Sequence, residues 1–277
     1  MMSAIGLYFI LLDSTGSIQW SVYLSVILSA IAITFFEWWY PYRRNWHPGP
    51  NDIGHDVTFM LLVQVLLPQL LSFLAALAIL TTFHQHDLQF NHWWPRHWAP
   101  AAQVVLMLLV ADFFRYWLHR AAHEWIIPLW RLHAVHHSPQ KLYWLNVGRF
   151  HPLEKSIQFL FDALPFILLG VSETVLSLYF VLYSVNGFFQ HCNIDLRLGF
   201  MNYLISGPEL HRWHHSRIIT ESNANYGNNL IIWDVVFGTR YLPDDKEVGE
   251  LGLLNRNYPD GFLAQMKTPF IKNLDKG

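Results

Sequence analysis

Eight of the 16 histidines in this chain stand in three clusters whose spacing suits metal binding. His119 and His123 are four residues apart, so a helix presents both side chains on one face. Two H-x-x-H-H motifs follow, and their i, i+3 and i+4 spacing also predicts one helical face of imidazoles each. These motifs consist of His133, His136 and His137 and of His211, His214 and His215. Because imidazole commonly binds iron, zinc and copper, the clusters predict a metal site.

Chance is a poor explanation of the repeated motif. At this histidine frequency a random chain would contain H-x-x-H-H roughly 0.05 times, whereas the sequence contains it twice. The alternative is a patch of histidines that are solvated or satisfied within the core. Eight imidazoles exceed the four ligands of a structural zinc site, so a dinuclear centre is the simpler interpretation. Soluble di-iron proteins use Glu and Glu-x-x-His ligands, a carboxylate pattern that this chain lacks.

The composition indicates a membrane protein. Hydrophobic residues make up 53% of the 277 residues and charged residues only 14%, and the 13 Trp, 12 Tyr and 20 Phe suit the water–lipid interface. The net charge of −2 gives no reason to expect nucleic acid as a partner. Cys192 is the single cysteine and is expected to be a small buried apolar side chain. The N-terminus lacks the basic region of a signal peptide, so we expect no cleavage.

Apolar stretches of membrane-spanning length lie before and between the histidine clusters. Residues 22–36, 57–82 and 100–118 each predict a span when their flanks are included, and Pro68 predicts a kink in the second. Residues 157–170 and 174–189 predict a shorter, partly inserted helical hairpin. The sequence therefore predicts an all-α integral membrane protein with about four transmembrane or membrane-embedded helices and a cytosolic, histidine-rich helical cap.

The distribution of basic residues predicts the orientation. Of the 18 Lys and Arg residues, only Arg96 falls in a segment expected on the outside, the loop at residues 83–99. Positive residues favour the cytoplasmic side of a membrane protein. We therefore expect a multi-pass chain with its N-terminus outside and its C-terminus and all three histidine clusters on the cytoplasmic face.

Further motifs surround the histidines in a fixed order. They are Asp112-x-x-x-Tyr116-Trp117-x-His119-Arg120-x-x-His123, Phe150-His151-Pro152-Leu153-Glu154, Asn225-Tyr226-Gly227 and Trp233-Asp234-x-x-Phe237-Gly238-Thr239. Together with the two H-x-x-H-H motifs, this set resembles the fatty acid hydroxylase/sterol desaturase superfamily of membrane-bound histidine-box di-iron oxidases. The similarity covers about residues 110–242, whereas the first hundred residues match only in being hydrophobic.

The resemblance implies a non-haem enzyme with two iron ions that uses O₂ to hydroxylate or desaturate an unactivated C–H of a sterol or fatty-acyl type lipid. Its two external electrons would come from a separate donor, such as a cytochrome b5 or ferredoxin type carrier with its reductase. We expect three regions: an N-terminal transmembrane region at 1–100, the catalytic domain at 101–242 and a cytosolic tail at 243–277.

The resemblance also implies the site residues, with no catalytic group expected beyond the metal ligands. The implied ligands are His119, His123, His133, His136, His137, His211, His214 and His215, with His191 as a further one. His151 is either a ligand or a hydrogen-bond partner of one. Asn186 stands where some family members carry another histidine, and it could reach the metal directly, reach it through water, or lie beside a ligand. Asp112, Glu154, Glu209 and Asp234 could orient ligand imidazoles, or could simply be helix caps and surface carboxylates.

The main rival interpretation is a membrane zinc protein, either a hydrolase or a metal transporter. Against a hydrolase, the H-E-x-x-H motif is missing, since His123-Glu124 is followed by Ile127 at the position of the second histidine. Against a transporter, the histidines flank the predicted spans, whereas transport sites lie within them.

Overall fold

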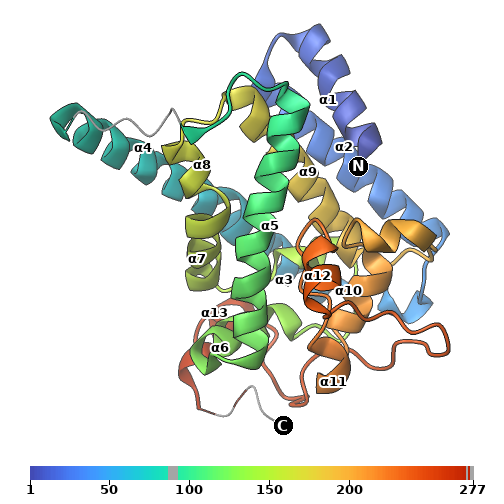
Figure 1. Ribbon diagram of the computed structural model, residues 1–277. Helices are drawn as coiled ribbons and strands as arrows, with labels where there is room; N and C mark the ends of the chain where they lie inside the picture. Colours follow the sequence, from blue (N-terminus) through green and yellow to red (C-terminus); the bar gives the residue numbers. More distant parts are fainter. Residues whose placement is uncertain (87–92, 273, 275–277) are drawn as a thin grey trace.

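The computed structural model describes residues 1–86, 93–272 and 274, and within these ranges the regular structure is helical, with three isolated β-bridges. Figure 1 shows the arrangement. The longer helices are α1 (Met2–Thr15), α2 (Ile18–Trp39), α3 (Pro50–Phe59), α4 (Leu67–His86), α5 (Pro100–Glu124), α6 (Ile127–His137), α7 (Pro152–Asp162) and α9 (Glu173–His191). The shorter ones are α8 (Leu164–Leu168), α10 (Pro208–His214), α11 (Ile219–Ser222), α12 (Ile232–Phe237) and α13 (Phe262–Gln265). Single turns connect them at Arg44–Trp46, Trp144–Gly148, Gly199–Tyr203 and Thr268–Phe270. The all-α prediction is confirmed.

Three helical stretches are long and apolar enough to cross a membrane: Ile18–Trp39, Pro50–Ile79 and Pro100–Glu124. The second has 30 residues, yet only 6% of its most apolar part is buried within the protein. An apolar helix of this length reaches about 45 Å, against about 30 Å of bilayer hydrocarbon. Because an apolar surface of this size is unstable in water, lipid is the environment that matches it. These three stretches coincide with the three predicted spans.

The second stretch is continuous, and its irregularity lies just before the expected kink. A π-helical segment, Met60–Leu66, joins α3 to α4 immediately ahead of Pro68. Proline has no N–H to donate and its ring crowds the preceding turn. The wider hydrogen-bond spacing of a π-helix accommodates this defect without breaking the helix. Gly148, in the loop before α7, packs closely against the start of this π-helical segment. A Cβ at Gly148 would lie 3.2 Å from the backbone of Met60.

The expected hairpin is present, but its first arm is divided. The helices α7 and α8 are separated at Ala163, two residues before Pro165, and the proline explains the division. Gly170 makes the turn with φ of 62°, in the left-handed region that glycine adopts readily. The second arm, α9, begins after Ser172, whose hydroxyl accepts from the Val175 N–H. The hairpin thus returns the chain to the level of the histidines.

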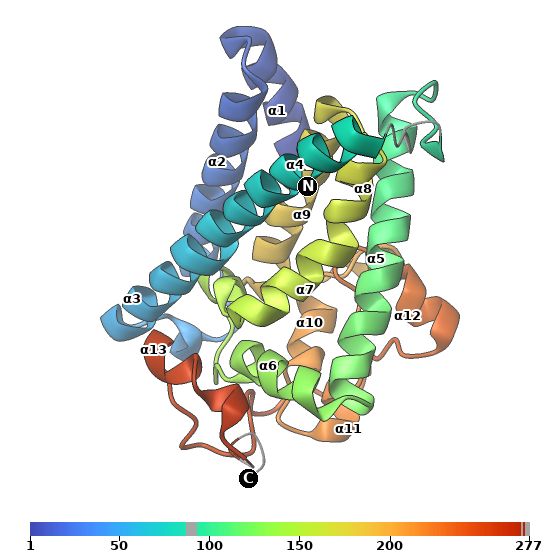
Figure 2. The ribbon, with the colours of Figure 1, turned by 90° about the vertical axis from the view of Figure 1, so that its left-hand side faces the viewer.

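The bundle has an apolar end and a polar end. At the apolar end α1, α2, α5, α8 and α9 share one buried cluster, in which Tyr8 donates to or accepts from Ser177 at 2.9 Å. At the other end α6 and α10 lie at the level of the C-terminal half of α5, as Figures 1 and 2 show. Figure 2 also shows α3 and α4 crossing the outside of the bundle. The described helix α4 extends to His86, within the loop expected at 83–99, and residues 87–92 of that loop lie outside the described residues.

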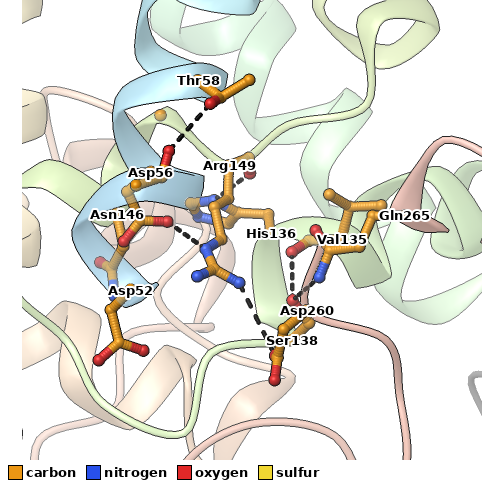
Figure 3. Close-up of polar contacts among 12 residues, drawn as sticks. Asp52, Asp56, Thr58, Val135, His136, Ser138, Asn146, Arg149, Asp260 and Gln265 are labelled. Carbon is orange, nitrogen blue, oxygen red and sulfur yellow. Dashed lines mark hydrogen bonds and ion pairs between the residues drawn. The ribbon is translucent and has the colours of Figure 1, made fainter. Parts of the chain in front are cut away.

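A buried ion pair joins the long outer helix to the polar end. Arg149 follows the turn Trp144–Gly148 and pairs with Asp56 of α3, and both side chains are at most 4% exposed. The Tyr143 hydroxyl donates to the same carboxylate. Figure 3 shows Arg149 between Asp56 and His136, whose ring nitrogen meets the Arg149 carbonyl at 3.2 Å. The ion pair therefore fixes a backbone group that contacts a candidate ligand.

We expect Asp56→Ala to lower the free energy of unfolding in detergent by about 3–5 kcal/mol, because it leaves the buried Arg149 charge with only the exposed Asp260 carboxylate, 4.0 Å away. The matched control is Lys141→Ala, which removes a neighbouring pair, Lys141–Asp52, whose side chains are 28% and 31% exposed. This partly solvated pair should contribute less than about 1 kcal/mol. Equal losses in the two variants would contradict the anchoring role of Asp56.

Candidate metal centre

Nine histidines converge in two adjoining groups at the polar end of the bundle. Within each group one ligand atom from every residue lies within 4.8 Å of the others. The first group contains His119, His123, His133, His137 and His214, and the second contains His136, His191, His211 and His215. In the described part of the chain, neither group includes a carboxylate or the cysteine. The structure thus brings together all eight histidines of the three clusters and adds His191.

Each H-x-x-H-H motif contributes to both groups, which corrects the expectation of one face per motif. His133 and His137 belong to the first group and His136 to the second, while His211 and His215 belong to the second and His214 to the first. At 3.6 residues per turn, positions i and i+4 differ by about 40°, whereas i+3 and i+4 differ by about 100°. The helices α6 and α10 therefore each direct a pair of imidazoles to one group and a single imidazole to the other.

The Nε2 atoms that face one another in each group are too many and too close to be explained by hydrogen bonds between the rings. The Nε2 atom of His137 lies 3.1 Å from the Nε2 atoms of His123, His133 and His214. An imidazole nitrogen carries either one proton or one lone pair, so three such neighbours cannot all be hydrogen-bonded to it. In the second group the Nε2 atom of His211 has two such neighbours, His191 at 3.0 Å and His215 at 3.1 Å. A shared metal ion satisfies several lone pairs at once, so the donor set fits a metal.

The spacing of the nitrogens indicates the geometry that suits them. Two nitrogen ligands about 2.1 Å from one metal lie about 3.0 Å apart at right angles and about 3.4 Å apart in a tetrahedron. The nearest pairs of Nε2 atoms here lie 2.9–3.1 Å apart, and all ligand atoms of a group lie within 4.8 Å of one another. The shortest separations match neighbouring ligands at right angles around one ion.

Outer hydrogen bonds hold the imidazoles in this orientation. The Nδ1 atoms of His119 and His214 lie 2.8 Å from the carbonyl oxygens of Tyr226 and Ala224. Because a carbonyl oxygen only accepts, we infer that Nδ1 carries the proton and Nε2 keeps its lone pair for the metal. The Arg149 carbonyl acts on His136 in the same way. Sequence reasoning missed these carbonyl partners, although the Asn225-Tyr226-Gly227 motif marked one of the segments.

Two asparagine side chains that the sequence did not single out also contact imidazoles. Asn146 Oδ1 lies 2.8 Å from Nδ1 of His191, and Asn223 Oδ1 lies 3.3 Å from Nδ1 of His123. Neither asparagine stands in a spacing that indicates metal chemistry, so the sequence carried no signal for them. By contrast, Nδ1 of His211 and of His215 is buried with no hydrogen-bond partner among the described residues.

Burial favours the neutral imidazoles that metal binding needs. The pKa values of His133, His137 and His215 lie well below the usual value, chiefly because burial disfavours the charged ring and also because neighbouring imidazoles repel a proton. Burial likewise lowers the pKa of His214 to about 4. The rings therefore offer lone pairs at neutral pH.

Glu154 is the predicted orienting carboxylate that contacts a histidine. Its Oε1 atom lies 2.7 Å from Nδ1 of His133 and also accepts from the Gln158 amide at 3.0 Å. Burial raises the pKa of the Glu154 carboxyl to about 8, an effect that Arg115 opposes. The Oε1 oxygen accepts in either protonation state of the carboxyl, so it fixes the tautomer of His133 with the proton on Nδ1 and the lone pair of Nε2 turned inward.

Asp112 and Asp234 bind backbone N–H groups of the segment that contacts the imidazoles. Asp234 accepts from the backbone N–H groups of Tyr226 and Gly227, at 2.8 and 2.7 Å. Asp112 accepts from the N–H groups of Asn229 and Leu230 and from the Asn229 amide. Both carboxylates thus hold the segment whose Tyr226 carbonyl orients His119, and neither touches an imidazole itself.

The remaining candidates lie apart from the imidazoles. Glu209 accepts from the Leu198 N–H and the Asn202 amide, and so joins α10 to the preceding segment. Asn186 donates to the carbonyl oxygens of Ser206 and Asn228, and its own Oδ1 has no partner in the described ranges. His151 is outside both groups: its Nδ1 accepts from the Leu153 N–H as the N-cap of α7, and its Nε2 lies 3.3 Å from the Met266 carbonyl.

These features define a class of protein: a helical chain with membrane-length helices and two adjoining all-histidine metal groups at one end. A family model described as fatty acid hydroxylase matches residues 104–239. An ornithine lipid hydroxylase of Rhizobium tropici is 38% identical over 253 residues, 89% of this chain and 75% of that protein. The chain therefore belongs to the fatty acid hydroxylase family, in the superfamily that its motifs resemble, and is an oxidoreductase.

More distant relatives share the histidine-bearing half. Human alkylglycerol monooxygenase is 31% identical over 160 residues, 57% of this chain and 34% of that protein. Methylsterol monooxygenase 2-2 of Arabidopsis thaliana is 28% identical over 158 residues, 54% of this chain and 58% of that protein. No solved structure matches the chain. These relatives do not favour the zinc hydrolase or transporter.

We expect His137→Ala and His211→Ala, one from each group, to lower the metal content per chain, because each removes an inward nitrogen from a shared ion. Glu154→Gln keeps the ligands but loses the carboxylate that orients His133, and should reduce metal affinity or activity roughly 10–100-fold. Metal analysis of protein purified without oxygen measures both effects.

The control for these variants is His151→Ala, which removes a buried imidazole that lies outside both groups. Its metal content should equal that of the unaltered protein. A loss of metal in His151→Ala as large as in His137→Ala would show that the boundary of the site is drawn in the wrong place.

Proposed function

We propose that this chain is an O₂-dependent di-iron oxidoreductase that hydroxylates or desaturates an unactivated C–H of a lipid. The observation that carries the proposal is the convergence of nine imidazoles into two adjoining groups without a carboxylate among the described residues. Two groups support two metal ions, and the monooxygenase names of the relatives favour iron, which can activate O₂, over zinc, which has no redox chemistry. The hydroxylase and monooxygenase names of the relatives support oxidation of a lipid.

When bound, the iron pair would supply the reductive activation of O₂ that breaks a C–H bond. Hydroxylation consumes one O₂, two electrons and two protons and yields an alcohol and one water. Desaturation consumes the same reactants and yields an alkene and two waters. In both cases the electrons come from a separate donor, and we propose a carrier of the cytochrome b5 or ferredoxin type with its reductase.

The protein's own groups orient the metal ligands and exclude solvent. The Tyr226, Ala224 and Arg149 carbonyls keep the outer ring nitrogens protonated, so that the inner ones stay available. The first group is capped by Trp130, whose ring lies 5.1 Å from that of His123. In the second group the Phe150 ring stacks on the His136 ring, with the ring centroids 4.2 Å apart. Aromatic packing of this kind limits solvent access, protects a strong oxidant from side reactions and holds one substrate carbon near it.

We further propose that the histidine groups and the C-terminus face the cytoplasm in a multi-pass arrangement. Arg96, the one basic residue expected outside, donates to the Gly170 carbonyl at 2.7 Å, at the turn between α8 and α9. That turn precedes the N-terminal end of α9, whereas His191 lies at its C-terminal end. The position of Arg96 supports the orientation predicted from the basic residues.

The direct test of the activity combines metal and lipid analysis. Protein purified without oxygen from iron-replete cells should hold about two irons per chain. Cells that make the chain should contain an oxidised lipid, either an alcohol or an alkene, that is lost when its gene is deleted. Stoichiometric zinc together with an unchanged lipid profile would contradict the proposal.

The orientation is tested with cysteines placed at exposed positions. We expect Ser14→Cys, in the last turn of α1 next to the α1–α2 connection, to react with an impermeant maleimide from outside the cell. Asp245→Cys, beyond α12, should react only after the membrane is opened. The natural Cys192 is buried and should stay silent in both variants. Labelling of both introduced cysteines from the same side would disprove this topology.

A further inference from the structure

A second buried polar cluster lies between α5, α7 and α9, on the side of the histidines that leads toward the apolar end. It consists of Arg115, Glu154, Gln158, Asp162, Tyr179 and Asn186, and each of these residues is at most 8% exposed. On α7 three of them repeat every four residues, so they share one face of the helix. Figure 1 shows α5 with α7 on one side and α9 on the other. The cluster therefore lines the inside of a three-helix interface.

The cluster contains hydrogen-bonding atoms that the described residues leave unsatisfied. Arg115 pairs with Asp162 only at 3.8 Å and meets the Asn228 side chain at 3.5 Å. Its Nε and Nη1 atoms are buried with no hydrogen-bond partner in the described part of the chain, and Nε has only the long contact with Asp162. The same holds for three acceptors, Glu154 Oε2, Gln158 Oε1 and Asn186 Oδ1, and for the Tyr179 hydroxyl. A buried guanidinium paired so poorly is unfavourable unless another group completes its bonds.

The chemistry of that missing group follows from the unsatisfied atoms. The two nitrogens of Arg115 need oxygen acceptors, whereas the three oxygens need N–H or O–H donors. A simple carboxylate supplies acceptors for the arginine alone, and a single sterol hydroxyl supplies one donor where three oxygens need them. Building on the proposed function, we infer that this cluster binds the polar end of the lipid substrate. That end carries both oxygen acceptors and N–H donors, as an amino-acid or amide headgroup does.

The position of the cluster determines which carbon is oxidised. Arg115 precedes His119 by one helical turn, about 6 Å along α5. Asn186 precedes His191 on α9 by a similar distance, and Glu154 contacts His133 directly. A headgroup held here places a carbon in or next to the polar end at the metal groups, while the acyl chains extend along the apolar helices.

The first experiment locates the added oxygen. Total lipids of cells with and without the chain are fragmented by tandem mass spectrometry. We expect the new hydroxyl or double bond on the fragment that contains the headgroup or its adjacent carbons, in a lipid with an amino-acid or amide polar end. An oxidation far along an acyl chain would overturn this inference and leave the proposed function intact. No oxidised lipid at all would overturn the proposed function.

The second experiment separates substrate binding from structural support. The double variant Arg115→Met with Asp162→Leu removes the ion pair without leaving either charge buried alone. We expect unchanged iron content and at least a tenfold fall in oxidised lipid. Arg115→Lys keeps the charge but not the planar fork, and should yield a mixture of oxidation positions. Normal oxidation by the double variant, or loss of its iron, would overturn the role of Arg115 in binding substrate.

The matched control is Arg120→Gln, which removes one positive charge from the same helix five residues later. Arg120 pairs with Glu124 in a partly exposed bridge at 3.1 Å and does not belong to the polar cluster. Its oxidised lipid and iron content should match those of the unaltered protein. A tenfold fall in this control would show that charge on α5, and not the binding geometry of Arg115, controls turnover.

Discussion

The rest of the structure depends on keeping nine neutral imidazoles close together with their lone pairs turned inward. Such rings do not attract one another, and burial makes their protonation unfavourable. Their positions must therefore be imposed from outside, by the helices that carry them and by fixed acceptors for their outer N–H groups. The carbonyls of Tyr226, Ala224 and Arg149 supply these acceptors, and each belongs to a segment without helical structure. The irregular parts of the chain thus hold the ligands as firmly as the helices do.

These segments are held in turn by buried charges. Asp234 and Asp112 bind successive backbone N–H groups between Tyr226 and Leu230, and Asp56 binds the Arg149 side chain. Asp112 belongs to the membrane-length helix α5 and Asp56 to the start of the outer helix. The apolar helices therefore hold the polar end through the carboxylates that they carry. An enzyme that takes a substrate from lipid needs this rigid connection, because a small displacement of the substrate carbon weakens catalysis sharply.

Sequence periodicity predicted the helices and that the histidines share helical faces. It could not predict which group each histidine joins, because contacts between distant segments determine that. The spacing of His119 and His123 predicted one shared face, and both imidazoles lie in the first group, because a single helix determines their relation. The same spacing rule could not assign His136 and His214, since the partition of each motif depends on where the other helices lie. Asn146 and His191 are 45 residues apart and meet only in the folded chain. The break before Pro165 follows from local chemistry, whereas the π-helical segment also reflects close packing against Gly148.

The division of each H-x-x-H-H motif between the two groups has a consequence for how the centre assembles. Because α6 and α10 each bind both groups, an ion in the first group restrains the two helices that carry three of the four ligands of the second. The conformational entropy of those helices is then lost only once, and the second ion binds at lower cost. Loading should be cooperative, visible as a sigmoidal uptake curve when metal-free protein is titrated. A half-filled enzyme is then a minor species, and the pair of ions behaves as one cofactor.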